Sequence, residues 1–237
     1  MTAPHLLLLP GLLTDARLWQ GQVAGLAGVA RATVADLTGA DTVPALAASA
    51  LAQAPPGQFL LAGLSMGGYV ALEIMRQAPD RVAGLALLDT SARPDTAEAT
   101  EGRRALMGLA ESAFPDVIET LLPKLVRPSG LSDAQLVTRI REMADSVGRE
   151  AFLRQERALI SRVDSRPFLG RLRCPTLVLC GREDVITPVE VHQELQAGIP
   201  AASLTIVEDS GHLSTLEQPR RVTDALKGWI ERISTER

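Results

Sequence analysis

Short, wholly apolar runs alternate with longer amphipathic segments along most of the chain. A run such as 85–88 (Leu-Ala-Leu-Leu) contains no polar residue, which is typical of a parallel strand whose sheet is covered by helices on both faces. The amphipathic segments between the runs repeat their apolar residues at helical spacing. The pattern predicts strands at about 5–9, 31–36, 58–63, 82–88, 175–180 and 202–207. It predicts helices near 15–27, 42–53, 67–77, 188–197 and 218–233.

This alternation predicts the fold class. Strand–helix–strand units joined by right-handed crossovers build an α/β protein with a doubly wound, mostly parallel sheet. Six runs give a sheet of about six strands, and 237 residues are enough for one large domain of this kind.

The alternation stops between residues 95 and about 165, where the pattern is helical throughout. Breaks are expected at Pro115, Pro123 and Gly148. The sequence therefore predicts two parts. A core domain comprises residues 1–92 and 167–237, and a helical cap, or lid, of residues 93–166 is inserted into it.

Composition and charge exclude several function classes. The 46% hydrophobic content supports a sizeable core, and the net charge of −4 comes without a basic stripe, so no nucleic-acid partner is expected. The apolar stretch near the N-terminus ends after four leucines with no basic residue before them, unlike a signal peptide. No run approaches the roughly 18 apolar residues of a membrane span. We expect a cytoplasmic protein with no membrane partner.

The most informative motif is Gly-Leu-Ser-Met-Gly-Gly at residues 63–68, between a predicted strand and a predicted helix. Its first five residues match Gly-x-Ser-x-Gly, the pattern of a nucleophile elbow. The turn pushes the hydroxyl of Ser65 outward, and glycines two positions away avoid collisions with the strand and the helix. Ser65 is therefore the candidate nucleophile.

A serine nucleophile needs a base, and the chain contains three histidines. His212 follows the predicted strand 202–207 in a glycine-containing loop, where an imidazole can reach over the edge of the sheet. His5 opens the first strand and is expected to be a polar residue at a strand end. His192 lies at the start of a predicted helix and is expected on its solvated face. His212 is the candidate base.

The base needs an acidic partner that fixes its tautomer. Asp184 follows the predicted strand 175–180, and the order Ser65, Asp184, His212 is the nucleophile–acid–base order of α/β-hydrolases. Asp89, at the end of the strand 82–88, is an alternative acid.

The whole chain resembles a small capped serine esterase, carboxylesterase-like, of the α/β-hydrolase fold superfamily. The motifs that carry the resemblance are Pro-Gly-Leu-Leu at 10–13, the elbow at 63–68, and the segment 181–188 paired with Ser-Gly-His at 210–212. The resemblance implies Ser65 as nucleophile, His212 as base and Asp184 as acid, although some members take the acid from the strand that ends at Asp89. It also implies hydrolysis of carboxylic esters, thioesters or lactones with no cofactor and no metal.

Acyl transfer also needs hydrogen-bond donors where negative charge develops on the carbonyl oxygen. The backbone N–H of Met66, at the N-terminus of the helix after the nucleophile, is one predicted donor to this oxyanion hole. The backbone N–H of Leu12, in the loop after the first strand, is the other. Relatives often carry His-Gly in this loop where this chain has Pro10-Gly11, so a polar side chain behind it is lost.

The expected substrate is a small-molecule ester with a small to medium acyl group. The same three residues also suit a C–C bond hydrolase, a lyase or a cofactor-free haloperoxidase, and a ligand-sensing protein with residual hydrolase activity is a further alternative. Exposed apolar residues of the cap would suit either a substrate or a homodimer.

The predicted cap contains both apolar and basic residues that could contact a substrate. Candidate pocket walls, which also suit plain helix packing, are Leu106, Met107, Phe114, Leu121, Leu122, Leu125, Phe152 and Ile160. The cap arginines are Arg103, Arg104, Arg127, Arg139, Arg141, Arg149, Arg154, Arg157, Arg162 and Arg166. A solvated, salt-bridged face is the simpler interpretation of these arginines. The alternative hypothesis is that one or two of these arginines line the pocket entrance and favour anionic acyl groups, which charge reversal of Arg154 and Arg157 would test.

Overall fold

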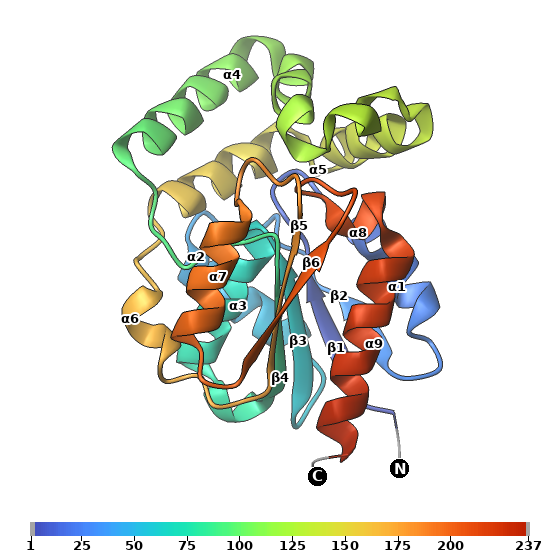
Figure 1. Ribbon diagram of the computed structural model, residues 1–237. Helices are drawn as coiled ribbons and strands as arrows, with labels where there is room; N and C mark the ends of the chain where they lie inside the picture. Colours follow the sequence, from blue (N-terminus) through green and yellow to red (C-terminus); the bar gives the residue numbers. More distant parts are fainter. Residues whose placement is uncertain (1–2, 236–237) are drawn as a thin grey trace.

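The computed structural model describes residues 3–235, and its centre is one six-stranded sheet (Figure 1). The strand order is β2-β1-β3-β4-β5-β6, and every neighbouring pair is parallel. The strands are β1 (His5–Leu9), β2 (Arg31–Val34), β3 (Phe59–Leu64), β4 (Val82–Leu88), β5 (Thr176–Gly181) and β6 (Ala202–Val207). The predicted α/β class and the number of strands are confirmed.

Helices cover both faces of the sheet, as the apolar strands require. Along β1, Leu6 and Leu8 belong to one hydrophobic core, whereas Leu7 and Leu9 belong to another, because successive side chains point to opposite faces. α1 and α9 pack together over one face, while α2, α3 and α7 cover the other. The helices outside the segment 97–160 are η1 (Ala16–Trp19), α1 (Gln20–Gly25), α2 (Val43–Gln53), α3 (Met66–Gln77), η2 (Pro79–Arg81), α6 (Arg166–Leu169), α7 (Val189–Gly198), α8 (Ser214–Glu217) and α9 (Pro219–Thr235).

The remaining helices lie over the carboxyl ends of the strands, at the top of Figure 1. This helical insertion consists of α4 (Ala97–Leu125), η3 (Pro128–Ser132) and α5 (Ala134–Ile160). The helix α4 is kinked at Ala113, two residues before Pro115, and α5 is kinked at Gly148, where φ is +76°. Pro123, in contrast, is accommodated inside α4. The insertion thus covers the edge where ligands bind in open parallel sheets.

The predicted domain bounds, 1–92 with 167–237 for the core and 93–166 for the cap, stay a prediction. Residues 1–2 and 236–237 of that predicted core lie outside the described residues. Of the helices within residues 3–235, none combines the length and apolar character needed to cross a lipid bilayer.

Candidate active site

Ser65 occupies a strained turn between β3 and α3. Its backbone has φ 54° and ψ −115°, a conformation that residues other than glycine rarely adopt. Two backbone hydrogen bonds hold the turn: Ser65 N–H donates to the Leu88 carbonyl at 3.0 Å, and Gly68 N–H donates to the Ser65 carbonyl at 2.9 Å. This geometry is the outward turn that the motif predicts.

The glycines that flank Ser65 are required by backbone contacts. A Cβ on Gly63 would lie 2.2 Å from the carbonyl oxygen of Gly67, and a Cβ on Gly67 would lie 2.3 Å from the carbonyl oxygen of Leu9. Both obstacles are main-chain atoms inside the sheet and the elbow, so they cannot move aside as a flexible side chain could. The two glycines therefore allow β3, α3 and β1 to approach one another closely.

We expect Gly67→Ala to lower the free energy of unfolding by at least about 2 kcal/mol, because the added methyl overpacks a backbone contact. Urea denaturation measures this change. Gly108→Ala is the matched control, since Gly108 lies in α4 and a Cβ there would meet no atom within 4 Å, so alanine should be neutral or slightly stabilising. Equal stability changes in the two variants would contradict the close approach at Gly67.

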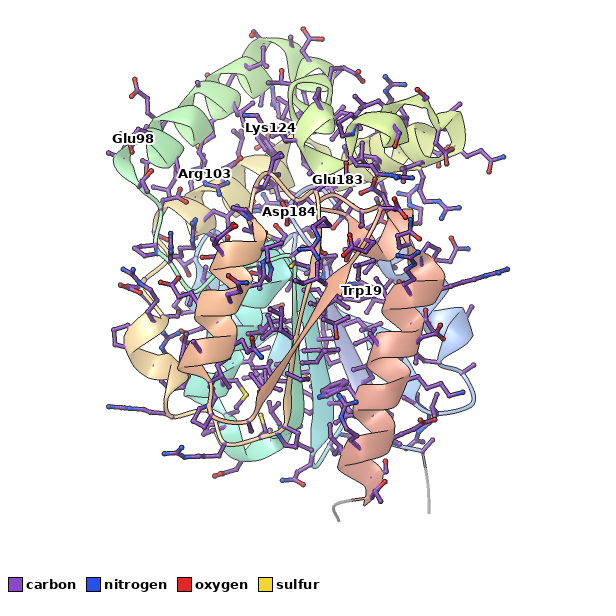
Figure 2. All side chains as sticks on the ribbon, viewed as in Figure 1. Trp19, Glu98, Arg103, Lys124, Glu183 and Asp184 are labelled. Atoms are coloured by element: carbon purple, nitrogen blue, oxygen red, sulfur yellow. The ribbon has the colours of Figure 1, made fainter. Side chains whose placement is uncertain are left out.

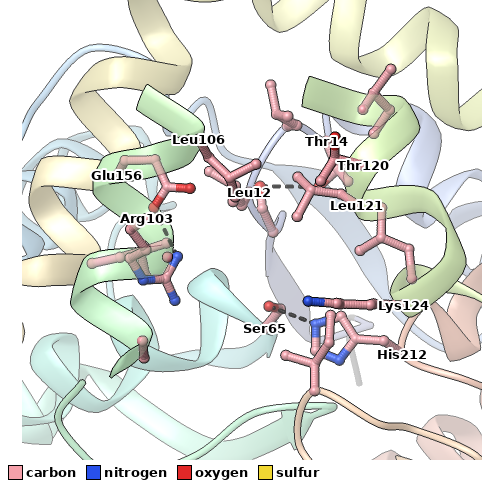
Figure 3. Close-up of a pocket in the computed structure, with 18 of the residues that line it drawn as sticks. Leu12, Thr14, Ser65, Arg103, Leu106, Thr120, Leu121, Lys124, Glu156 and His212 are labelled. Atoms are coloured by element: carbon pink, nitrogen blue, oxygen red, sulfur yellow. Dashed lines mark hydrogen bonds and ion pairs between the residues drawn. The ribbon is translucent and has the colours of Figure 1, made fainter. Parts of the chain in front are cut away.

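Ser65, His212 and Asp184 form a continuous chain of hydrogen bonds. The His212 Nε2 lies 2.8 Å from the Ser65 Oγ, and the His212 Nδ1 lies 2.8 Å from the Asp184 Oδ2 (Figure 3 shows the first contact). Asp184 is held in turn by its own loop, where Oδ1 accepts from the N–H groups of Ile186 and Thr187, each at 2.9 Å. The hydroxyl of Thr187 donates to Oδ2 at 2.6 Å. The structure thus brings together the three side chains predicted from the sequence.

The ionisation of this chain follows from burial and mutual attraction. Burial raises the pKa of Asp184, but the charge and hydrogen bond of His212 outweigh it, and the pKa is lowered overall. Burial likewise lowers the pKa of His212, yet the charge and hydrogen bond of Asp184 dominate and raise it above the ordinary 6.5. The pair therefore favours an ionised aspartate that stabilises a protonated imidazole.

Asp89, the alternative acid, is buried beside the same histidine but is engaged elsewhere. Its Oδ1 accepts from the Gly181 N–H at 2.9 Å, and its Oδ2 accepts from the Ser214 hydroxyl at 2.5 Å. Burial, together with the charge of Asp184, raises the pKa of Asp89 to about 8. Among the described residues, Asp184 is the carboxylate that hydrogen-bonds to His212, and Asp89 is a mostly neutral neighbour.

The loop after β1 lies directly against Ser65. A Cβ on Gly11 would be 3.4 Å from the Ser65 Cβ. Two N–H groups of this loop form hydrogen bonds within the protein. The Leu13 N–H donates to the Gln155 Oε1 at 3.2 Å, and the Thr14 N–H donates to the Gly11 carbonyl at 3.4 Å. Met66 begins α3, so its N–H has no acceptor one turn earlier in the helix. Leu12 lies in the loop beside Ser65 and Met66 follows Ser65 in the chain, and the role of their N–H groups as oxyanion donors stays a prediction.

Comparison with protein families matches residues 6–225 to the alpha/beta hydrolase family. The chain belongs to this family. A thermophilic esterase from Thermogutta terrifontis, whose structure holds malate, superposes with a TM-score of 0.89 at 33% identity, covering 98% of this chain and 91% of that one. A pimeloyl-[acyl-carrier protein] methyl ester esterase from Nitrosomonas europaea is 28% identical over 233 residues, or 92% of each chain. The biotin biosynthesis bifunctional protein BioHC from Cellvibrio japonicus is 24% identical over 250 residues, and this chain spans about half of its length.

The pocket of this α/β hydrolase has a volume of about 750 Å³ and lies between Ser65 and the helical insertion. Three of the predicted walls, Leu106, Leu121 and Leu125, line it. The other five candidates are not among the lining residues. Sequence reasoning missed several apolar wall residues, namely Leu109, Ile118, Ile140, Leu159, Val185, Ile186 and Leu213.

The charged residues that line the pocket include one arginine rather than the arginine-rich set of the predicted cap. Of the insertion's arginines, Arg103 alone lines the pocket. The other charged lining residues are Glu98, Lys124 and Glu156. Arg154 instead donates to the Thr38 carbonyl at 2.8 Å, outside the lining. Figure 2 shows Arg103 and Lys124 on the helical insertion above Asp184. Arg103 is thus the cap arginine that the pocket exposes to a substrate, whereas Arg154 and Arg157 do not line the pocket.

His192 is fully buried, and the expectation of a solvated position is wrong. Its Nε2 accepts from the Thr90 N–H at 2.9 Å, and its Nδ1 lies 3.2 Å from the Pro188 carbonyl. The Thr90 hydroxyl donates to the Ser65 carbonyl at 2.8 Å, so the neutral ring of His192 supports the elbow through Thr90. Burial lowers the pKa of His192 to about 4. His5, as predicted, opens β1 at a half-buried position.

The signal for His192 was present in the helical spacing. His192, Leu195 and Ile199 recur at steps of three and four residues, and all three are buried. Gln155, also buried, carried no such signal, because its partners lie far away in the sequence: its Nε2 donates to the Leu37 carbonyl at 3.2 Å.

Within residues 3–235, no three His, Cys, Asp or Glu side chains gather in a way that could hold a metal ion.

Proposed function

We propose that this protein hydrolyses carboxylic esters of small to medium acyl groups through an acyl-enzyme intermediate. Ser65 is the nucleophile, His212 the base and Asp184 the acid. The observation that carries the proposal is the hydrogen-bond chain from Ser65 to Asp184, with 2.8 Å at each step, at the floor of an apolar pocket. The esterases among the relatives support a hydrolase that acts on ester bonds.

The first step forms the acyl-enzyme. His212 Nε2 accepts the proton of the Ser65 hydroxyl as Oγ attacks the ester carbonyl carbon. The carbonyl oxygen becomes negative and accepts hydrogen bonds from the backbone N–H groups of Met66 and Leu12. Met66 is the first residue of α3, and the dipole of this helix also favours negative charge at its N-terminus. The proton on His212 then passes to the alkoxy oxygen as the C–O bond breaks and the alcohol leaves.

The second step returns the enzyme to its starting state. A water molecule occupies the place of the alcohol, and His212 accepts one of its protons as the water oxygen attacks the acyl carbon. Collapse of the second tetrahedral intermediate breaks the bond to Ser65 Oγ, which recovers its proton from His212, and the carboxylic acid leaves. Asp184 stays ionised throughout and stabilises the imidazolium that forms in each step.

The helical insertion acts as the cap in this proposal. Its α4 and α5 supply most of the apolar wall, and a volume of about 750 Å³ lies within the usual range of small-molecule sites. Excluding water from such a pocket strengthens the hydrogen bonds that stabilise the oxyanion. The methyl ester esterases among the relatives make methyl esters a suitable set of test substrates.

The proposal predicts the pH dependence of kcat/KM. His212 must be neutral to accept the Ser65 proton, so activity is lost as the pH falls through its pKa. Because Asp184 raises that pKa above 6.5, the midpoint of the acidic limb should lie above pH 6.5. His192 titrates near 4 and should not contribute above about pH 5. Initial rates at low substrate between pH 4.5 and 9 measure the limb, and a midpoint well below 6.5 would contradict the assigned pair.

The function itself is tested with p-nitrophenyl esters from acetate to decanoate. Multiple turnovers are expected, and the chain-length optimum measures the depth of the acyl pocket. A phosphonate probe that labels Ser65 reports on the nucleophile independently of turnover. Labelling without hydrolysis of any ester would contradict ester hydrolysis and favour C–C bond hydrolysis or ligand sensing at the same serine.

A further inference from the structure

The pocket has two ends, and the proposed mechanism assigns a different part of the ester to each. The leaving alcohol must lie near His212, because this histidine returns the proton to the alkoxy oxygen. The acyl chain then extends from the Ser65 Oγ away from His212. Figure 3 shows His212 and Lys124 on one side of Ser65, and Arg103 and Glu156 on the other. The Arg103–Glu156 side is therefore the acyl end.

A buried ion-pair cluster lies at this acyl end, and two of its members, Arg103 and Glu156, line the pocket. Arg103 Nη1 donates to the Glu156 Oε2 at 2.8 Å, and Arg103 Nε donates to the Asp95 Oδ2 at 2.7 Å. Arg162 pairs with the other oxygen of Asp95. The side chains of Glu156 and Asp95 are 0% and 2% exposed, and that of Arg103 is 20% exposed. Two carboxylates face two guanidinium groups, so the charges of the cluster cancel.

Two hydrogen-bonding groups of this cluster remain unused. The Glu156 Oε1 is buried and has no hydrogen-bond partner within the described residues. Arg103 binds the two carboxylates through Nε and Nη1, and its Nη2 makes no hydrogen bond to any of residues 3–235. A buried carboxylate oxygen without a donor is costly, and native sites usually satisfy it with water or a ligand. Both residues line the pocket, next to the space that a substrate would occupy.

We propose that Arg103 and Glu156 form a subsite for a neutral hydrogen-bonding group on the acyl chain, such as a hydroxyl or a carboxamide. Such a group donates to the Glu156 Oε1 and accepts from the Arg103 Nη2. The inference rests on the proposed function, which defines the acyl end. It names the substrate class more narrowly: esters whose acyl group is polar at its far end and apolar between.

The charge balance explains why the group is neutral. A carboxylate on the acyl chain could bond to Arg103, but it would also face the unpaired oxygen of Glu156, and like charges at close range repel strongly in a buried site. A plain alkyl chain would leave the Glu156 Oε1 unsatisfied. A hydroxyl or a carboxamide meets both the donor and the acceptor. The pocket thus differs from the arginine-lined, anion-binding site of the sequence-based hypothesis.

The test compares three methyl ester series of equal chain length, from butanoate to octanoate, by kcat/KM in a pH-stat. The series are methyl alkanoates, methyl ω-hydroxyalkanoates and monomethyl esters of dicarboxylic acids. At the optimal length, the ω-hydroxy ester should exceed both others by about 10- to 100-fold, the worth of a hydrogen bond to a charged group. An ω-hydroxy ester no better than the alkanoate at every length would overturn the subsite.

Glu156→Gln tests the charge balance directly. It removes one negative charge and leaves the guanidinium groups in excess, so the rate on the dicarboxylic monoester relative to the ω-hydroxy ester should rise at least about tenfold. Glu119→Gln is the matched control, because Glu119 pairs with Arg141 between the same two helices but is exposed and outside the pocket. An unchanged ratio in Glu156→Gln, or an equal change in Glu119→Gln, would contradict the proposal.

A second variant guards against misfolding of the first. Arg103→Met combined with Glu156→Leu replaces the pair by apolar side chains of similar length, a change that buried ion pairs often tolerate. In this variant the ω-hydroxy and alkanoate esters should react at similar rates. A preference that persists would overturn the subsite. Failure of the proposed function is distinguishable, because the wild type would then hydrolyse none of the three series.

Discussion

Ser65→Ala is expected to lower kcat for ester hydrolysis by about 10⁵- to 10⁶-fold, the effect seen when the nucleophile of a Ser-His-Asp enzyme is removed. The alanine leaves His212, Asp184 and the pocket in place but provides no oxygen to attack the carbonyl. The residual rate then comes from binding and the oxyanion hole alone. Hydrolysis of p-nitrophenyl butyrate, with both proteins purified in parallel, measures the ratio.

The loss should not come from unfolding. Within residues 3–235 the Ser65 hydroxyl hydrogen-bonds to His212 alone, and alanine is as strained as serine at φ 54°, so the free energy of unfolding should change by less than about 1 kcal/mol. Ser112→Ala is the matched control. Among the described residues, this exposed serine on α4 hydrogen-bonds only to the Leu109 carbonyl, and the loss of its hydroxyl should leave kcat unchanged. More than about a thousandth of wild-type activity in a folded Ser65→Ala protein would remove Ser65 from the role of nucleophile.

Much of the fold could be predicted because its signals are local. The inner strands β1, β3, β4 and β5 are apolar runs that are almost wholly buried, as in β3, where all six residues are buried. The elbow is a five-residue pattern in which Gly63 is required by a contact within the same strand–turn–helix unit, whereas Gly67 is required by the close approach of Leu9 of β1. Ser65, Asp184 and His212 each follow a strand, and a parallel sheet brings the carboxyl ends of its strands to one edge, so their meeting could also be predicted.

The polar groups that support the site were harder to predict because their partners are distant in the sequence. Gln155 bonds to Leu13, 142 residues away, and His192 to Thr90, 102 residues away. Whether a buried glutamine or histidine meets a particular N–H depends on how α5 and α7 pack, which periodicity does not determine. The same holds for Glu156, which helical spacing places on a buried face without indicating Arg103 as its partner. Sequence patterns therefore predict the reacting residues better than the groups that position them or shape the pocket.

Asp184→Asn is expected to lower kcat by about 10⁴-fold through the tautomer of His212. In the wild type, Oδ1 of Asp184 accepts from two loop N–H groups, those of Ile186 and Thr187. An asparagine would keep its carbonyl oxygen there and place its NH₂ where Oδ2 now faces the His212 Nδ1. Nδ1 must then accept a hydrogen bond, so Nε2 carries the proton and cannot receive one from Ser65. Kinetics with p-nitrophenyl butyrate measure the loss.

Asp89→Asn is the matched control, since the same substitution is made at a second buried carboxyl beside the same histidine. The asparagine oxygen can accept from the Gly181 N–H and its NH₂ can donate to the Ser214 hydroxyl, which preserves both contacts. Because a pKa of about 8 leaves Asp89 mostly neutral at pH 7, little charge is lost. We expect kcat within about tenfold of wild type, since neither change reaches a group that contacts the substrate.

The pH profiles separate the two acids even if both variants lose activity. The contact with Asp184 is what raises the pKa of His212, so Asp184→Asn should move the acidic limb of kcat/KM to lower pH. In Asp89→Asn the limb should move less, because Asp89 acts on His212 through charge alone, and at pH below 8 that charge is largely absent. Near-normal kcat and an unmoved limb in Asp184→Asn, with collapse in Asp89→Asn, would assign the acid to Asp89. The expected order, a large loss at 184 and a small one at 89, follows from a single contact, that of the His212 Nδ1 with the Asp184 Oδ2.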